Sequence, residues 1–146
     1  MKIEIQLDDQ YEEPKVVIYT KELTKEVQNV QDRLLNWTPQ VLSGFHGDRL
    51  EVIDPKEIVR IYAQDGKVLL ITDEKEYILR LKIYELEERL EKDKFVRISR
   101  SEIINLKKAV DFDLSYTGTI SVKLANGDNS FVSRRYLKKV KQILGI

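Results

Sequence analysis

The first third of the chain combines two short apolar runs with one helical stripe. Ile3, Ile5 and Leu7 alternate with polar residues, which indicates a half-buried strand, and residues 16–19 form a second, β-branched run. Thr20 can then cap a helix whose single apolar face is made by Leu23, Val27, Val30 and Leu34. A break follows at Pro39, Gly44 and Gly47. The pattern predicts a β-β-α subdomain over residues 1–45, too small to bury much surface by itself, that packs on the rest of the chain or on another subunit.

From residue 46 onward, short apolar runs alternate with turn signals. Asp65-Gly66 and Asn126-Gly127 are the strongest hairpin signals. The runs between the turns predict strands at residues 50–53, 58–62, 68–72, 77–79, 95–98, 110–116, 119–124 and 131–132. Residues 46–146 are therefore expected to be a second domain, and the fold class is mainly β with short helices, an α+β arrangement.

Three short helices complete the pattern. Ile83, Leu86 and Leu90 share one face of a helix, and the glutamates between them share the other. Ser99 and Glu102 fit a capping box, which predicts a helix through residues 103–106. Ser133 can cap a last helix whose buried face holds Leu137, Val140 and Leu144, and this start places Arg134 and Arg135 in the first turn.

Composition narrows the class of protein. The 146 residues are 42% hydrophobic and 34% charged, which suits a folded, soluble domain. No apolar run is long enough to span a bilayer, and the N-terminus has no apolar signal segment, so we expect a cytoplasmic protein that is not itself in the membrane. The absence of cysteine excludes disulfides, thiolate zinc sites and a cysteine nucleophile.

Catalytic chemistry has little support in the sequence. His46 is the only histidine, and no glycine-rich phosphate loop is present. The densest carboxylate cluster, residues 85–91, lies on the polar face of one helix. Asp8-Asp9 and the pair Asp111 and Asp113 would hold a hard cation only with several more oxygen ligands. We therefore expect no enzymatic activity, no cofactor and no metal site.

The zero net charge hides an uneven distribution. Residues 95–146 carry ten basic and four acidic side chains, whereas residues 1–45 and 46–94 are each net −3. Two basic segments stand out, residues 95–108 around Arg97 and Arg100 and residues 130–141 around Arg134 and Arg135. The planar guanidinium of an arginine at such a position can donate two hydrogen bonds to a phosphate or to a guanine base. The alternative is an ordinary solvated basic surface.

These segments also carry a resemblance. The chain is similar to the LytTR family of bacterial DNA-binding domains from about Arg49 to its end. The matching stretches are PKEIVRIYA at 55–63, the Asp65-Gly66 hairpin, LKIYELEERL at 81–90, FVRISRSEIINL at 95–106 and VSRRYL at 132–137. The resemblance implies an elongated fold of three small antiparallel sheets whose loops enter successive major grooves. We expect no phosphoacceptor receiver domain of the kind found in many relatives, because the residues before the match do not show its strand pattern.

Carried over by position, the resemblance also implies a set of DNA-facing residues. Gly66 and Lys67 belong to the first hairpin loop. Arg100 and Arg135 are expected to contact base edges, preferably guanine. The remaining cations are expected to contact phosphate or to be bystanders; they are Lys67, Arg97, Lys107, Arg134 and Lys138. Asn105 is expected to tie its turn to a backbone group, and Tyr136 to pack rather than stack on a base.

Together these features predict a sequence-specific transcriptional regulator that binds double-stranded DNA as a homodimer. The alternative from another class is a protein–protein interaction module that binds a regulatory partner such as a membrane protein. Exposure of Leu23, Val27 and Val30 would favour this alternative. A small hydrolase would need a pocket lined by paired carboxylates, which the pattern does not indicate.

Overall fold

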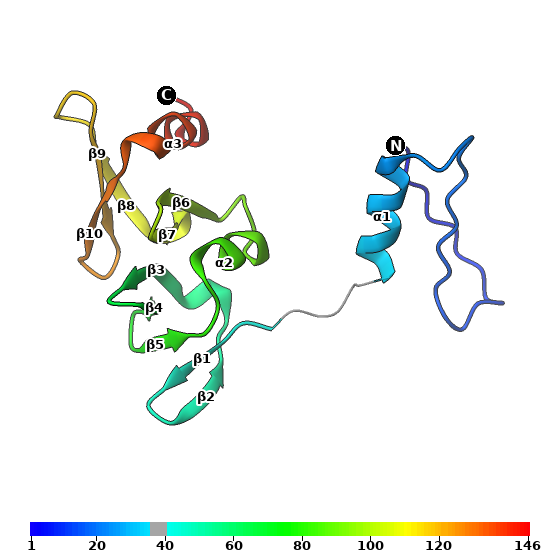
Figure 1. The fold of residues 1–146 in the computed structure, drawn as a ribbon, viewed down its shortest axis with the longest axis horizontal. Helices are drawn as coiled ribbons and strands as arrows, with labels where there is room; N and C mark the ends of the chain where they lie inside the picture. Colours follow the sequence, from blue (N-terminus) through cyan, green and yellow to red (C-terminus); the bar gives the residue numbers. More distant parts are fainter. Residues whose placement is uncertain (36–40) are drawn as a thin grey trace. The chain divides into compact units, whose positions relative to one another are not determined.

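The computed structural model describes residues 1–35 and 41–146 (Figure 1). The chain divides into two compact units, Met1–Pro39 and Gln40–Ile146. The first unit contains helix α1 (Lys25–Leu35), and the second contains the sheets and helices α2 and α3. In the described residues no helix is long and apolar enough to cross a membrane.

The two strands predicted in the first unit are absent. Residues 1–20 contain no strand, and Ile3, Ile5 and Leu7 are each more than four-fifths exposed. A strand needs a neighbour to satisfy its backbone groups, and none pairs with this segment in the structure. The helix also begins later than predicted, because Thr24 rather than Thr20 caps it: Thr24 Oγ1 accepts a hydrogen bond from the N–H of Val27 at 3.3 Å. Val27 is buried, whereas Leu23 is exposed.

The second unit is built on a seven-stranded antiparallel sheet in the order β2-β1-β5-β4-β3-β7-β6. Its strands are β1 (Ser43–His46), β2 (Arg49–Val52), β3 (Ile58–Gln64), β4 (Lys67–Thr72), β5 (Glu76–Leu79), β6 (Phe95–Ser99) and β7 (Glu102–Asn105). The expected strands at 50–53, 58–62, 68–72, 77–79 and 95–98 are confirmed to within two residues.

A second antiparallel sheet has the order β10-β9-β8, with β8 (Ala109–Asp113), β9 (Ile120–Leu124) and β10 (Asn129–Val132). The described residues thus form two sheets, not the three that the resemblance implied, because β1 and β2 join the larger sheet through a pair between Phe45 and Ile78. The mainly β, antiparallel fold class is confirmed.

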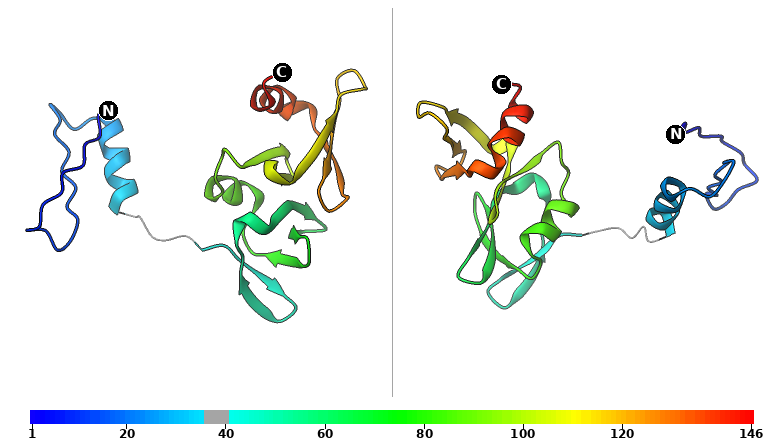
Figure 2. Two further views of the ribbon diagram at one scale, coloured as in Figure 1. Left: turned by 180° about the vertical axis from the view of Figure 1, so that it is seen from behind. Right: turned by 45° about the horizontal axis from the view of Figure 1, so that its top comes forward.

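The α-helices of the second unit are α2 (Ile83–Arg89) and α3 (Leu137–Leu144). The unit also contains three single-turn 3-10 helices, η1 (Pro55–Glu57), η2 (Leu106–Lys108) and η3 (Arg134–Tyr136). The last predicted helix therefore starts as η3 and continues as α3. Ser133 precedes it as predicted but makes no side-chain capping hydrogen bond. The β1–β2 hairpin and α3 lie at opposite ends of this unit in every view (Figures 1 and 2).

The large sheet is covered on both faces where β3, β7 and β6 lie. On one face α2 packs through Ile83 and Leu86 against Ile61 and Ile103. On the other face Ile98 and Ile104 pack against the second sheet and α3; the remaining buried members of this cluster are Val59, Val96, Ile120, Val122, Leu124, Val132 and Val140. This double burial explains why all four side chains of β7 are buried, including those of Glu102 and Asn105.

The capping-box helix predicted after Ser99 is wrong. Residues 102–105 form β7, a strand with all four side chains buried between β3 and β6. Ser99 Oγ does accept a hydrogen bond from a nearby N–H, that of Ser101 at 3.2 Å, but it closes a hairpin turn rather than a helix. Pairing with two neighbouring strands and burial of Ile103 and Ile104 outweigh the local capping preference.

The predicted break at Pro39, Gly44 and Gly47 is also partly wrong. Residues 36–40 lie outside the described part of the chain. Residues 43–52 form the β1–β2 hairpin, in which His46 pairs with Arg49 and Gly47 adopts a left-handed φ of +64°. The predicted domain boundary after residue 45 thus falls within β1. Gly44 is needed for close packing rather than for a turn, since a Cβ there would lie 2.7 Å from Leu79 Cδ2.

Candidate nucleic-acid interface

Two of the predicted DNA-facing loops emerge from the same edge of the large sheet. The β3–β4 turn contains Asp65 and Gly66, both with left-handed φ values, of +52° and +76°. The β6–β7 turn contains Arg100. The end of β3 is tied to the second turn because the N–H of Ala63 donates to the carbonyl of Ser101 at 2.8 Å. The sheet register therefore brings Gly66 and Lys67 to the same edge as Arg100.

The third basic loop, η3, is joined to β6. The N–H of Ser133 donates to the carbonyl of Ile98 at 2.9 Å, two residues before the β6–β7 turn begins at Arg100. Arg134 and Arg135 follow directly, and both are exposed. Because backbone hydrogen bonds link β3, β6 and η3 through these turns, segments far apart in the sequence meet along one edge of the unit.

Five of the predicted cations present free charge at the surface. Each is exposed, and none has a carboxylate of another described residue within 4.0 Å; they are Lys67, Arg100, Arg134, Arg135 and Lys138. A guanidinium with no protein partner keeps its donors available for phosphate or a base edge. We call these five residues the basic edge; Lys138 belongs to it because α3 continues directly from η3.

Arg97 is placed differently from these cations. Its side chain is only 17% exposed. Nε donates to the carbonyl of Ser99 at 3.0 Å, and Nη2 donates to the carbonyl of Arg100 at 2.8 Å. Nη1 lies 3.6 Å from Oε1 of Glu87 on α2. The guanidinium carbon also lies 5.7 Å from the ring centre of Tyr136 on η3. Every nitrogen of Arg97 is thus directed at the protein.

Lys107 is the one predicted site residue that the structure places elsewhere. It belongs to η2, which follows β7 at the end opposite the Arg100 turn. Asn105, next to η2, has the structural role predicted for it: its Nδ2 donates to the carbonyl of Ile58 at 2.8 Å, and its Oδ1 accepts from the N–H of Lys107 at 3.0 Å. Tyr136 is half-buried and packs against the second core cluster, as predicted.

A polar network joining the two sheets was missed in the sequence. Ser130 Oγ on β10 donates to Oε2 of Glu102 on β7 at 2.6 Å, and Arg60 Nε on β3 lies 3.0 Å from the same oxygen in an ion pair. Arg60 Nη1 also lies 3.5 Å from Oδ2 of Asp128. Burial raises the pKa of Glu102, although Ser130 and Arg60 act in the opposite direction. The only signal in the sequence was an arginine among the apolar residues of β3.

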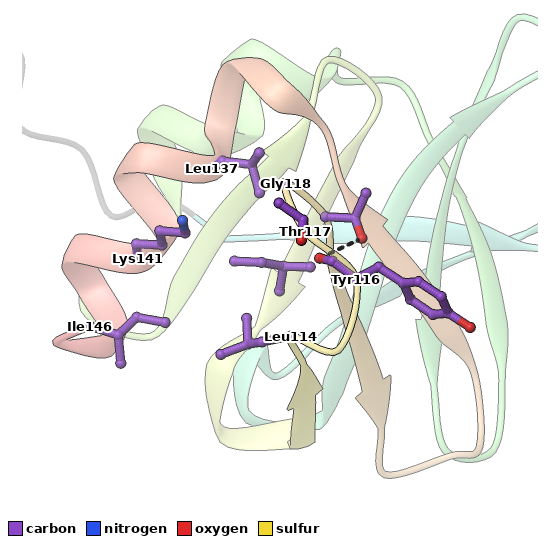
Figure 3. Close-up of a pocket in the computed structure, with 9 residues that line it drawn as sticks. Leu114, Tyr116, Thr117, Gly118, Leu137, Lys141 and Ile146 are labelled. Carbon is purple, nitrogen blue, oxygen red and sulfur yellow. Dashed lines mark hydrogen bonds between the residues drawn. The ribbon is translucent and has the colours of Figure 1, made fainter.

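A pocket of about 260 Å³ lies between α3 and the β8–β9 connection (Figure 3). Leu137, Lys141 and Ile146 line it from the α3 side, and Leu114 lines it from the opposite side. The side chain of Tyr116 points away from α3. Of the described lining residues only Lys141 is charged, so the walls do not supply the paired acid and base that hydrolysis requires. In the described residues no group of three or more His, Cys, Asp or Glu could hold a metal ion.

Comparison with known proteins gives two kinds of likeness. An HTH-type transcriptional regulator of Staphylococcus aureus strain MSSA476, itself uncharacterized, is 27% identical over all of this chain and 99% of its own length. A related regulator of strain MRSA252 is 26% identical over the same shares. A LytTr DNA-binding domain from Bacillus cereus superposes with a TM-score of 0.70, covering 75% of this chain and all of that domain, at 23% identity. The second likeness is one of fold.

The names of the staphylococcal relatives refer to a helix-turn-helix, but α1, α2 and α3 of the described chain are separated from one another by strands. The family model is more informative. The model of the LytTr DNA-binding domain matches residues 48–145, which include both sheets except β1, together with the whole basic edge. The chain therefore belongs to the LytTR family of DNA-binding domains.

Proposed function

We propose that this protein is a sequence-specific transcriptional regulator that acts in the cytoplasm and reads the major groove of double-stranded DNA through loop residues. The observation that carries the proposal is the basic edge: exposed cations at the start of β4, in the β6–β7 turn, in η3 and at the start of α3. Backbone hydrogen bonds tie β3 to the β6–β7 turn and η3 to β6. A surface of this kind can follow a phosphate backbone while short turns reach the bases.

Within the basic edge we assign two roles. Arg100 and Arg135 contact base edges, with guanine preferred because its O6 and N7 match a guanidinium fork. Arg134, Lys67 and Lys138 contact phosphates and fix the position of the protein on the duplex. Gly66 allows the β3–β4 turn its left-handed backbone at φ +76° without a side chain that would keep DNA away. Lys107, at the other end of β7, is a bystander.

The test begins with selection of bound fragments from random DNA, followed by binding measurements on the selected site and on a scrambled duplex. Arg135→Ala should cost about 1–3 kcal/mol on the selected site and relax the preference at one position. Lys138→Ala should weaken binding to both duplexes alike and reduce the slope of log affinity against log salt concentration by about 1. Equal losses on the two duplexes for Arg135→Ala would contradict the base contact.

A second candidate function rests on the first unit. Apolar side chains of residues 1–23 are exposed in the structure, with Ile3 at 85%, Leu7 at 96% and Leu23 at 64%. Because a unit of this size cannot bury them alone, we propose that it binds a protein, either a second copy that makes a homodimer on paired DNA sites or a regulatory membrane protein. Val27 is buried in α1, so the exposed apolar surface consists of the segment before the helix together with Leu34 and Leu35 at the end of the helix.

Sedimentation equilibrium distinguishes between a second copy of the chain and a different protein as the partner. A homodimer shows a concentration-dependent mass, and Leu7→Ser in the exposed segment should shift it toward the monomer. A monomer at all concentrations would leave the heterologous partner as the surviving form of this candidate. Salt distinguishes this surface from the basic edge, because phosphate contacts weaken steeply with salt and an apolar contact does not.

A further inference from the structure

Arg97 occupies the junction of three elements that the proposed DNA contacts depend on. It lies on β6, its partner Glu87 lies on α2, and the ring of Tyr136 lies on η3. Its two short hydrogen bonds go to the backbone of the β6–β7 turn. One side chain therefore touches the turn that carries Arg100 and the helical turn that carries Arg135.

The backbone of the β6–β7 turn is fixed by hydrogen bonds that its carbonyl groups accept. Arg97 donates to the carbonyls of Ser99 and Arg100, and the N–H of Ala63 donates to the carbonyl of Ser101. Three successive carbonyls thus have fixed donors, two of them from one guanidinium. A planar guanidinium holds such a pair of acceptors in a defined orientation, which a lysine ammonium cannot do. The side chain of Arg100 remains exposed while its backbone is fixed.

The same guanidinium faces η3. Its central carbon is 5.7 Å from the ring centre of Tyr136, the residue directly after Arg135. The ion pair with Glu87 on the remaining nitrogen fixes the guanidinium from the side of α2. Since Arg97 is 17% exposed and all of its nitrogens have protein partners, its charge is not offered to a phosphate.

We infer that Arg97 is a positioning residue that couples the two base-reading arginines, Arg100 and Arg135, and makes no contact with DNA. This inference rests on the proposed function and deepens it, because it assigns sequence preference partly to a residue that never touches a base. The sequence left Arg97 as either a phosphate contact or a bystander, and this inference gives it a positioning role instead.

The test measures affinity for the selected site and for the scrambled duplex over a salt series, for the wild type, Arg97→Ala and Arg97→Lys. Both variants should lose about tenfold or more of the ratio between the two duplexes, the size of one good base contact, with an unchanged salt slope. Arg134→Ala is the matched control, a nearby exposed arginine whose loss should reduce the slope by about 1 and leave the ratio unchanged. A reduced slope for Arg97→Ala, or full rescue by lysine, would overturn the inference.

The energetic coupling between Arg97 and each base-reading arginine, measured in double-mutant cycles, is a readout that a purely structural role of Arg97 would not change. In an Arg97→Lys background, Arg100→Ala and Arg135→Ala should each cost less on the selected site than in the wild type, because misplaced arginines have less to lose. If the costs simply add, Arg97 does not position them. A smaller folded fraction would lower binding to both duplexes equally and leave the ratio unchanged.

Glu87→Ala covers the case in which both Arg97 variants fail to fold. It removes the anchor on α2 while leaving every residue of the basic edge in place, and it should lower the ratio in the same direction with an unchanged slope. A wild-type ratio retained in folded Glu87→Ala would overturn the inference. If the wild type itself shows no preference for the selected site, the proposed function fails instead, so the two failures are distinguishable.

Discussion

The same alternation of apolar and polar residues gives a strand in the second unit but none in the first. Ile3, Ile5 and Leu7 alternate with polar residues yet form no strand and stay exposed, whereas the alternating residues 76–79 form β5 with Tyr77 and Leu79 buried. The two segments differ in whether a neighbouring strand is available for backbone hydrogen bonds. β5 is hydrogen-bonded to β4 on one side and to β1 on the other, and no described strand lies beside residues 3–7.

Alternation specifies which side chains share a face, but it does not supply the neighbouring strand that stabilises them. β7 shows the converse. Its residues Glu102 to Asn105 have no alternation and carry a helix-capping signal, but they form a strand because β3 and β6 flank them. Substitutions of residues with sheet neighbours should therefore cost more stability than the same substitutions of residues without them.

The largest contrast is expected from Ile104→Ala. Ile104 is fully buried on β7 within the second core cluster, so removing its side-chain atoms should lower the free energy of unfolding by about 2–5 kcal/mol. Urea unfolding followed by circular dichroism measures this change. A loss below about 1 kcal/mol would mean that β7 is not packed on both faces as the structure describes.

Next in size is Gly44→Ala, which tests whether β1 belongs to the core of the second unit. The new Cβ would lie 2.7 Å from Leu79 Cδ2 and 2.8 Å from Tyr77 Cβ, and this crowding should cost about 1–3 kcal/mol in urea unfolding. Gly47→Ala is the contrasting variant. Nothing lies within 4 Å of its added methyl group, and its cost, about 1 kcal/mol, arises from the left-handed φ of +64°.

Only the crowded site should respond to space made nearby. Leu79→Val in the same chain should recover part of the loss caused by Gly44→Ala and none of the loss caused by Gly47→Ala. Additive losses for the first pair would place β1 away from Leu79.

A smaller, pH-dependent contrast comes from the network at Glu102. Burial raises the pKa of Glu102 above its ordinary 4.5, so the folded protein holds this proton more tightly than the unfolded chain does. The stability that this group contributes is complete below pH 4.5 and is lost as the pH rises through the raised pKa. Since Glu102→Gln cannot ionise, the stability of the wild type relative to this variant should fall as the pH rises.

Urea unfolding of the wild type and each variant between pH 2 and pH 7.5 measures this trend. Asp113→Asn is the control with the opposite sign, because hydrogen bonds from Ser115 lower the pKa of Asp113 below 3.8, and its contribution is lost as the pH falls. A relative stability of wild type over Glu102→Gln that rises with pH would show that Arg60, not burial, dominates at Glu102.

Much of the second unit could be predicted because its signals are local. Asn126-Gly127 marks a hairpin in which Gly127 has a φ of +94°, and the stripe of Ile83 and Leu86 marks the buried face of α2. Such turns and faces depend on residues close together in the chain. The exposed positions of Arg100 and Arg135 also agree with the expectation from the sequence.

The parts that failed depend on contacts between distant residues. Glu102 was assigned to a helix cap because Ser99 precedes it by three positions, but its partners are Arg60 and Ser130, which no local pattern connects to it. Arg97 could be interpreted only as a phosphate contact or a bystander, and that expectation stays untested; the positioning role inferred for it was not visible for a similar reason. Its charge is visible in the sequence, whereas its partner Glu87 lies on another element.

The smallest effect is expected from Ile5→Ala, the same chemical change as Ile104→Ala in the segment that has no strand partner. Ile5 is 82% exposed, so its loss should change the free energy of unfolding of the second unit by less than about 0.5 kcal/mol. Urea unfolding at low protein concentration measures this term, and sedimentation at high concentration measures self-association, which the same variant should weaken if residues 1–23 meet a second copy. A loss above about 1 kcal/mol at low concentration would show that Ile5 is packed within a single chain. Residues 3–7 would then differ from β5 in what they pack against, not in lacking a packing partner.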